Sequence, residues 1–304
     1  MATQLDTLPS LLLVRTTARR GRKAAKRLRA GIAFAHLRLR NLAARRPATG
    51  TAPVVVSMTT HGARLKTVAT ALESIARGST RPQRLLLWLQ TPEQFRTAPA
   101  ALRRLERRGV EVLLSPDYGP HTKYYPYVAS VERHTLPLVT ADDDIIYPRN
   151  WLALLTDANR RHPDTVCGHW ISIIGPSVDG IADYATWARA RDTAARTANF
   201  AVGVSGVIYP PAMLQELKGH GTGFAAACPG ADDIWLKWVA LRAGILVRQV
   251  RPVPRHFPMI PGSQGDALMK TNVGESRNDH WIRGLFTAED VAVLTSSAAR
   301  HRMD

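Results

Sequence analysis

From residue 53 onward, short apolar runs alternate with amphipathic stretches. Apolar, β-rich runs predict strands, and apolar residues that recur every three or four positions predict helices. The predicted strands cover 54–58, 84–89, 110–114, 136–140, 203–209 and 245–250. The predicted helices cover 64–77, 98–108, 124–133, 150–161 and 233–242. This alternation predicts an α/β fold with a mostly parallel sheet flanked by helices.

A different pattern precedes this region. Apolar residues recur at intervals of four and three at Leu28, Ile32, Ala35, Leu39 and Leu42, which places them on one helical face. Arg and Lys occupy much of the rest, so we expect a basic N-terminal helical arm, followed by a linker rich in small residues and proline at 47–53. One interpretation is attachment to an anionic membrane surface through residues 15–46. The other is a helix that packs on the body of the protein or on a partner.

The charge of the chain supports this division. The 304 residues hold 41 Lys+Arg against 24 Asp+Glu, a formal net charge of +17. Residues 1–50 hold 12 of the basic residues and one acidic residue, so most of the excess lies there. We therefore predict a basic arm and linker at 1–50 and a single domain at 51–304. No nucleic acid is expected as a partner, because the arm lacks interleaved aromatic residues.

Membrane spans, export signals and cysteines indicate the compartment and the class of protein to expect. The longest apolar candidate for a membrane span, Leu11 to Val14, stops at Arg15, and the pair Arg19-Arg20 is not followed by the apolar core of an export signal. We predict a cytoplasmic protein, held peripherally at the inner face of the plasma membrane if the arm binds there. Only two cysteines are present, without CxxC spacing, which argues against a disulfide scaffold and a cysteine zinc site.

Three consecutive carboxylates, Asp142, Asp143 and Asp144, follow the predicted strand 136–140. Left unpaired in a half-buried crevice, they would repel one another strongly, so a cation is the simplest explanation. Side chains two positions apart in a strand or tight turn point the same way, which lets Asp142 and Asp144 face one ion while Asp143 points aside. Oxygen ligands of this kind suit Mg²⁺ or Mn²⁺. The alternative is helix capping by Asp144 with the other two solvated.

A second acidic pair, Asp232-Asp233, opens the predicted helix 233–242. Aspartate near a helix N-terminus is often only a cap. A carboxylate held there is also well placed as a general base, if a substrate hydroxyl comes within hydrogen-bond reach.

Several further side chains lie on loops at the predicted ligand edge of the sheet. His256 follows the last predicted strand and is a candidate for a third metal ligand. Four cationic residues on such loops can neutralise a diphosphate: Arg64, Lys123, Arg255 and Lys270. The chain has no GxxxxGK[ST] phosphate loop, no GxGxxG after a strand, no DxDxT and no GxSxG, which argues against the classes that depend on those motifs.

Together these motifs resemble those of bacterial glycosyltransferases of the GT-A fold, close to the large inverting family 2 type. The residues that carry the resemblance are Ser57-Met-Thr-Thr60, Arg64, the triplet Asp142-Asp143-Asp144, the segment 203–211 and Ala231-Asp232-Asp233-Ile-Trp235. The similarity spans about residues 53–285 and leaves the arm outside it. The resemblance implies a nucleotide-sugar donor in the first half, a glycan or lipid-linked acceptor in the second, and a role in cell-surface or secreted polysaccharide synthesis.

The resemblance also implies roles for individual residues. Asp142 and Asp144 would hold Mn²⁺ or Mg²⁺ against the donor diphosphate, with His256 as a further ligand. Asp233 would deprotonate the acceptor hydroxyl, with Asp232 as the substitute. The remaining positions expected around the nucleotide and donor are Thr59, Arg64, Asp117, Lys123 and Asp143. These enzymes often carry an aspartate after the second strand, where this chain has Gln90, so Asp117 after the third strand is expected to compensate.

Two other functions use the same features. A non-catalytic protein of this fold could bind an anionic polymer or lipid through its basic surface, and this alternative stays open. A sugar nucleotidylyltransferase is disfavoured, because no glycine-rich GGxGTR-like turn follows the first predicted strand.

Overall fold

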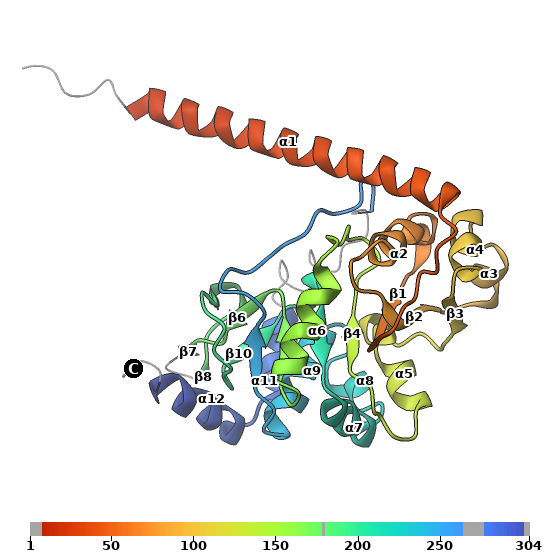
Figure 1. Cartoon of the computed structure of the whole chain (residues 1–304). Helices are drawn as coiled ribbons and strands as arrows, with labels where there is room; N and C mark the ends of the chain where they lie inside the picture. Colours follow the sequence, from red (N-terminus) through yellow and green to blue (C-terminus); the bar gives the residue numbers. More distant parts are fainter. Residues whose placement is uncertain (1–7, 178–179, 264–276, 301–304) are drawn as a thin grey trace, which may run out of the picture.

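The computed structural model describes residues 8–177, 180–263 and 277–300. Its centre is a seven-stranded sheet in the order β12-β5-β11-β4-β1-β2-β3 (Figure 1). The strands are β1 Ala52–Thr59, β2 Pro82–Leu89, β3 Val110–Leu114, β4 Leu138–Thr140, β5 Val166–Gly168, β11 Val207–Tyr209 and β12 Val247–Gln249. The pairs β1–β2, β2–β3, β1–β4 and β12–β5 are parallel, whereas β11 is antiparallel to both its neighbours. The predicted α/β class and mostly parallel sheet are confirmed.

Helices cover both faces of this sheet. They are α2 Val68–Ala76, α3 Pro92–Arg96, α4 Ala100–Glu106, α5 Tyr125–Ser130, α6 Trp151–Arg161, α7 Pro211–His220, α8 Phe224–Ala227, α9 Asp232–Arg242, α11 Arg277–Leu285 and α12 Ala288–Arg300. Alternate residues of β1 point to opposite faces. Val54, Val56 and Met58 join one buried cluster with α2, α4 and α6. Val55 joins a second cluster with α5, α7 and α9 on the other face.

The second half of the sheet differs from the sequence prediction in two places. The predicted strand 203–209 begins only at Val207, because 203–205 form a 3-10 turn, η4 (Gly203–Ser205), which ends at Gly206 with a φ of 92°. A side chain at Gly206 would also meet the Trp151 ring at 2.6 Å, so glycine is needed here for both backbone and space. β5 was not predicted, because its three residues are too short a run to give a periodic signal.

Two small antiparallel sheets complete the second half. One contains β6 Ile171–Ile173, β9 Ala188–Arg189 and β10 Asn199–Ala201, and the other pairs β7 Pro176–Ser177 with β8 Gly180–Ile181. β6 follows β5 in the chain after two residues, and Phe200 of β10 packs into the same buried cluster as α9. These strands therefore cover the region where α9 begins.

The arm forms one long helix, α1 (Leu8–Ala43), which runs across one end of the molecule and extends beyond it (Figure 1). The last turns of α1 pack against α2 and α4, with Leu37 completely buried. Among the described residues, no helix is both long enough and apolar enough to cross a membrane.

A buried ion cluster fixes α1 to the body. The Glu73 carboxylate in α2 is fully buried, and the Arg108 guanidinium donates to both its oxygens at 2.5 and 3.3 Å. From α1, Arg40 Nε lies 2.9 Å from Glu73 Oε1, and Asn41 Nδ2 donates to Glu73 Oε2 at 3.4 Å. One carboxylate thus connects α1, α2 and the turn that follows α4.

Replacing Glu73 is expected to destabilise the fold strongly. Glu73→Ala leaves the buried Arg108 guanidinium without its carboxylate, which should lower the free energy of unfolding by about 3–5 kcal/mol. The control is Glu111→Ala, which breaks the half-exposed ion pair with Arg84 and should cost at most about 1 kcal/mol. Urea denaturation of the three proteins measures both values. Equal losses for the two variants would contradict this account of the α1 attachment.

Candidate active site

The acidic triplet lies where the sequence predicted it, just beyond the carboxyl end of β4. The backbone continues the sheet for one residue, because the Ala141 N–H donates to the Ser57 carbonyl at 3.0 Å. The Asp142 N–H then donates to the Tyr147 hydroxyl oxygen at 2.8 Å, and Tyr147 is completely buried. A rigid aromatic residue therefore fixes where the triplet leaves the sheet.

The three carboxylates have different partners. Asp143 is buried and accepts hydrogen bonds from Thr60 Oγ1 at 2.6 Å and from an Arg64 guanidinium nitrogen at 3.0 Å. A second Arg64 nitrogen lies 3.5 Å from Asp144 Oδ2. Arg64 Nε donates to the Ser263 carbonyl at 3.2 Å, so this guanidinium also holds the 258–263 segment against the triplet. Arg64, from η1 (Gly62–Lys66), is thus a structural centre of the site.

Lys123 connects the two acidic motifs. It ends η2 (Gly119–Lys123), and its ammonium lies 2.9 Å from Asp142 Oδ1 and 3.2 Å from Asp232 Oδ2. The side chains of Lys123, Asp142 and Asp232 are 13%, 22% and 10% exposed, so the cluster is largely shielded but still open to solvent at Asp142. The structure therefore brings the triplet and the pair together around one cation.

The pKa values of the charged residues in this cluster follow from burial and from these ion pairs. Burial alone would lower the pKa of Lys123, but the carboxylates of Asp142, Asp232 and Asp233 outweigh it and raise that pKa well above its usual value. Burial would likewise lower the pKa of Arg64, and Asp143 and Asp144 raise it. Both cations therefore stay charged. Burial raises the pKa of Asp143 despite its bonds to Thr60 and Arg64.

Asp233 has a backbone partner on another segment. Its Oδ2 accepts the Gly203 N–H at 2.9 Å, while Oδ1 is enclosed and has no hydrogen-bond partner in the described part of the chain. A Cβ on residue 203 would lie 2.6 Å from Oδ1, so this close approach requires glycine. Burial, with the charge of Asp232 added, raises the pKa of Asp233 to about 8.

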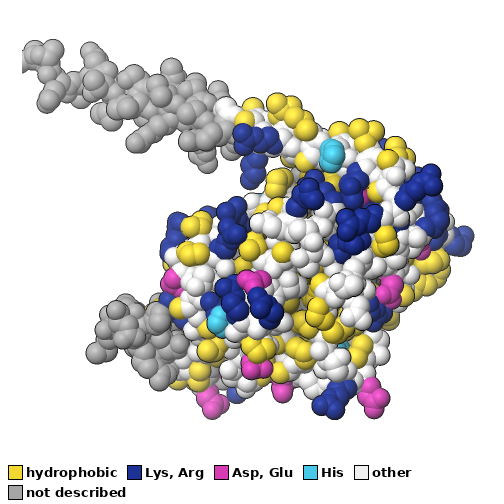
Figure 2. All heavy atoms as spheres, viewed as in Figure 1, with side chains coloured by type: hydrophobic (Ala, Val, Ile, Leu, Met, Phe, Trp, Pro, Cys, Tyr) yellow, Lys and Arg dark blue, Asp and Glu magenta, His cyan; other side chains and the backbone are white. Residues whose placement is uncertain are grey.

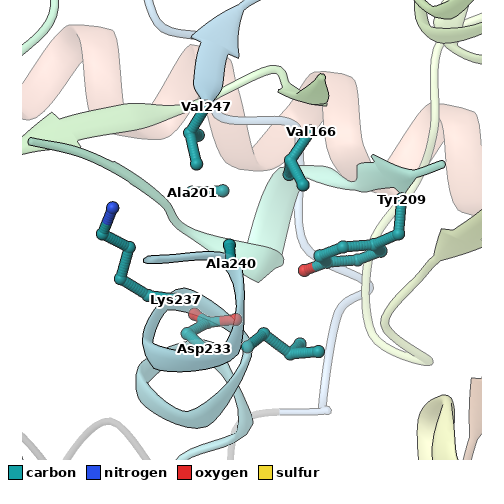
Figure 3. Close-up of a pocket in the computed structure, with 8 residues that line it drawn as sticks. Val166, Ala201, Tyr209, Asp233, Lys237, Ala240 and Val247 are labelled. Carbon is teal, nitrogen blue, oxygen red and sulfur yellow. The ribbon is translucent and has the colours of Figure 1, made fainter. Parts of the chain in front are cut away.

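Asp233 lines a small cavity of about 10 Å³, the size of one water molecule. Figure 3 shows it beside Tyr209 and one turn of α9 before Lys237, whose ammonium points away from the carboxylate. The Lys237 ammonium donates to the Thr197 carbonyl, and burial lowers the pKa of Lys237 to about 7. Of the acidic pair, Asp232 thus forms the ion pair with Lys123, and Asp233 accepts from the Gly203 N–H and lines the cavity.

The other predicted positions are spread along the same edge of the sheet. Thr59 Oγ1 donates to the Trp88 carbonyl at 3.2 Å, between the ends of β1 and β2. Gln90 Nε2 lies 3.5 Å from Asp117 Oδ1, so the structure does bring the residue after β2 beside the aspartate after β3. Arg255 lies in the loop after β12, where its N–H donates to the His169 carbonyl. Lys270 is outside the described residues.

His256 has a different environment. Its ring lies edge-on to Trp170, with 5.6 Å between the ring centres, and partial burial together with the Lys26 ammonium of α1 lowers its pKa. In the part of the chain that the structure describes, no three His, Cys, Asp or Glu side chains gather as a metal-binding group. The structure therefore does not group His256 with Asp142 and Asp144 as three ligands.

The chemistry of the triplet still fits a hard divalent ion. Mg²⁺ and Mn²⁺ are commonly bound through one or two carboxylates, with phosphate oxygens and water completing the coordination. Asp142 is the most exposed member of the triplet cluster, and Asp144 lies two positions further along. This donor set fits a metal that binds together with a diphosphate better than one held by protein alone.

Sequence reasoning missed several residues that build the site. Thr60 had no predicted role of its own, although its hydroxyl donates a hydrogen bond to Asp143. Tyr147, Gly203 and Lys237 had no motif of their own, and their roles arise from contacts between distant segments. A signal in the sequence was available only for Tyr147, an aromatic residue that follows the triplet within an apolar run.

The raised pKa of Asp233 predicts a specific pH dependence of stability. Between its unfolded pKa near 4 and its folded pKa of about 8, the folded state holds a proton that the unfolded state has released. The free energy of unfolding should therefore fall as pH rises through this window, by up to about 1.4 kcal/mol per pH unit. Asp233→Asn should remove this contribution.

The free energy of unfolding of wild type and of Asp233→Asn is measured in urea at several pH values from about 6 to 8. The difference between the two proteins is then compared across these pH values. Other titrating groups are common to both and cancel; they include His121 and His169, whose pKa values burial lowers to about 4. Asp183→Asn, an exposed aspartate, should reproduce the wild-type profile. A difference that is constant with pH would show that Asp233 has an ordinary pKa.

Comparisons with known proteins place the fold in context. No protein-family model and no curated protein matches this sequence. Among solved structures, a mannosyltransferase from Pyrobaculum calidifontis in complex with GDP-Man and Mn²⁺ is similar with a TM-score of 0.49 and 15% identity, covering 92% of this chain and 79% of that one. TarS residues 1–349 from S. aureus has a TM-score of 0.42 and 12% identity, covering 67% and 59%. A 4-diphosphocytidyl-2C-methyl-D-erythritol synthase from Anaerococcus prevotii has 0.44 and 8%, covering 75% and 95%. The chain is similar to these proteins in the arrangement of its strands and helices.

Proposed function

We propose that this protein is a glycosyltransferase that moves a sugar from a nucleotide-diphosphate donor to an acceptor hydroxyl. The observation that carries the proposal is the meeting of the triplet Asp142–Asp144 and the pair Asp232–Asp233 around Lys123. The meeting point lies at the carboxyl end of the parallel strands, where α/β sheets bind their ligands. The division into an arm at 1–50 and a transferase domain at 51–304 is part of the same proposal.

The donor would bind over the triplet. Asp142 and Asp144 would hold Mn²⁺ or Mg²⁺, which when bound supplies positive charge for the leaving diphosphate. Arg64 and Lys123 remain charged in the folded protein and would act on the same diphosphate. Thr59 and Asp117, with Gln90, would line the nucleotide side of the pocket. Asp143 would act mainly by holding Arg64 in place.

The transfer step needs a base on the acceptor side. As the bond between the anomeric carbon and the diphosphate oxygen breaks, the acceptor oxygen forms a new bond to that carbon and its proton passes to a carboxylate. With a pKa of about 8, Asp233 is mostly protonated at pH 7 and becomes an effective base as the pH rises toward 8. Asp232 is the alternative, because its ion pair with Lys123 places it next to the donor side. Attack from the face opposite the diphosphate would invert the anomeric centre.

The finer parts of the function follow from the resemblance stated for the motifs. They are a metal requirement, an inverting outcome, a hexosyl donor, and a glycan or lipid-linked acceptor in cell-surface or secreted glycan synthesis. A third ligand from His256 would require the 251–258 loop to move toward the triplet, since the structure shows His256 beside Trp170.

Donor binding provides the experiment. The full chain is mixed with a panel of nucleoside diphosphates and nucleotide sugars, with and without Mn²⁺, and its melting temperature is measured. A donor at 100 times its dissociation constant should stabilise the fold by about 2.7 kcal/mol, which corresponds to a shift of about 5–10 °C for a domain of this size. We expect such a shift for one nucleotide, with Mn²⁺ present, and its loss in Asp142→Asn and Asp144→Asn.

The matched control is Asp157→Asn. Asp157 is half-exposed and forms ion pairs with Arg160 and Arg161 of its own helix, so this variant should keep the full shift. A transfer assay with the nucleotide so identified then follows release of the free nucleoside diphosphate. No shift with any donor, or a shift that both triplet variants retain, would contradict the proposed function and favour the non-catalytic binding protein.

A further inference from the structure

Helix α1 has two apolar faces. One faces the body, where Ala30 and Leu37 are 8% and 0% exposed and Asn41 is buried beside Glu73. The other faces solvent, where Leu28, Ile32, Leu39 and Leu42 are each 62–66% exposed. At about 100° per residue, the centres of the two faces lie about 160° apart around the helix axis. In the described part of the chain, packing on the body therefore leaves the second face exposed.

This solvent-facing set, Leu28, Ile32, Leu39 and Leu42, is called the outer face of α1. It holds four of the eight large apolar side chains that are strongly exposed in the described part of the chain. Single exposed apolar residues are ordinary, but a continuous row of them marks an interaction site. Figure 2 shows apolar side chains along the edge of α1 that points away from the molecule, with Lys and Arg on the side toward it.

Basic residues flank the outer face on both sides. At about 100° per residue, Arg27 and Arg38 lie on one side of it and Arg29 on the other; all three are exposed, and α1 contains no acidic residue. The partner must therefore be apolar at its centre and anionic at its edges.

We propose that the outer face of α1 binds an anionic phospholipid bilayer, with the helix lying in the plane of the membrane surface. The apolar row enters the boundary between headgroups and acyl chains, and the flanking bases contact lipid phosphates. This surface is independent of the proposed sugar transfer. A second copy of the chain is a poorer occupant, because two helices of this charge would repel each other.

The attachment of α1 to the body fixes the direction in which the outer face points. The Glu73 cluster fixes the last turns of α1, so the outer face has a set orientation relative to the sheet. The loop after β12 rises toward α1 (Figure 1), near Lys26 of that helix. The bilayer would then lie near the edge of the sheet that carries the acidic cluster.

Vesicle flotation of the full chain tests the proposal. The probes are vesicles of phosphatidylcholine alone and vesicles of phosphatidylcholine mixed with phosphatidylglycerol. We expect binding to the anionic vesicles, weaker binding at high salt, and no binding to phosphatidylcholine alone. The combined variant Leu28→Gln, Ile32→Gln, Leu39→Gln and Leu42→Gln keeps good helix formers and should bind at least about tenfold more weakly.

Matched variants on the body separate the outer face from general effects. Leu114→Gln with Val253→Gln replaces exposed apolar residues elsewhere and should leave binding unchanged. Arg27→Gln, Arg29→Gln and Arg38→Gln should abolish the preference for anionic lipid, whereas Arg160→Gln, Arg161→Gln and Arg283→Gln should not. Circular dichroism checks that each variant folds.

Three results would overturn the proposal. They are no binding of wild type to the anionic vesicles, equal binding by the fourfold glutamine variant, and a wild-type dimer in light scattering that this variant abolishes. The last result would identify the outer face as an interface between copies of the chain. The shift in melting temperature on donor binding is measured in a separate experiment. A failure of lipid binding therefore does not contradict the proposed transferase function.

Discussion

The ammonium group of Lys123 holds together two acidic motifs that come from different halves of the chain. It contacts Asp142 beyond β4 and Asp232 at the start of α9, both in a largely shielded position. Without a cation between them, carboxylates this close would repel each other strongly and would take up protons. The position of α9 against the carboxyl edge of the sheet, and with it the placement of Asp233 beneath Gly203, therefore depends on this lysine.

Arg64 plays the corresponding part on the other side of the triplet. Its guanidinium contacts Asp143, Asp144 and the Ser263 carbonyl, which holds the 258–263 segment over the strand ends. The two cations thus sit on opposite sides of a row of acidic groups. An anionic donor and a divalent ion would enter a site whose charges are already arranged, and such preorganisation lowers the cost of stabilising a leaving group.

Much of the fold could be predicted from local patterns. The first three strands and helix α6 follow from apolar runs and helical periodicity, and the structure has them within a few residues of the predicted bounds. β5 could not be predicted, because three buried residues carry no period, and the 3-10 turn at 203–205 depends on the left-handed conformation of Gly206. The helical face of Leu28 to Leu42 was visible in the sequence, but its opposite face, which packs on the body, was not.

The residues of the site also divide into those that the sequence predicts and those that it does not. The triplet, the pair, Arg64 and Lys123 stand out because charged residues next to apolar strands are unusual, and the structure brings them together. Which carboxylate of the pair faces the triplet depends on the start of α9 to within one residue, so spacing alone does not decide it. Tyr147 and Gly203 act through contacts with residues far away in sequence, which no local pattern records.

A double-mutant cycle on stability tests the shared cation most directly. Asp142→Asn and Asp232→Asn are made singly and together, and their free energies of unfolding are compared. If Lys123 serves both carboxylates, each single variant leaves it one of its two direct ion pairs and the double variant removes both. The double variant should then lose more than the sum of the singles, by about 0.5–3 kcal/mol. Additivity within about 0.3 kcal/mol would mean that the two motifs do not share a cation, and it would contradict the single site described for this protein.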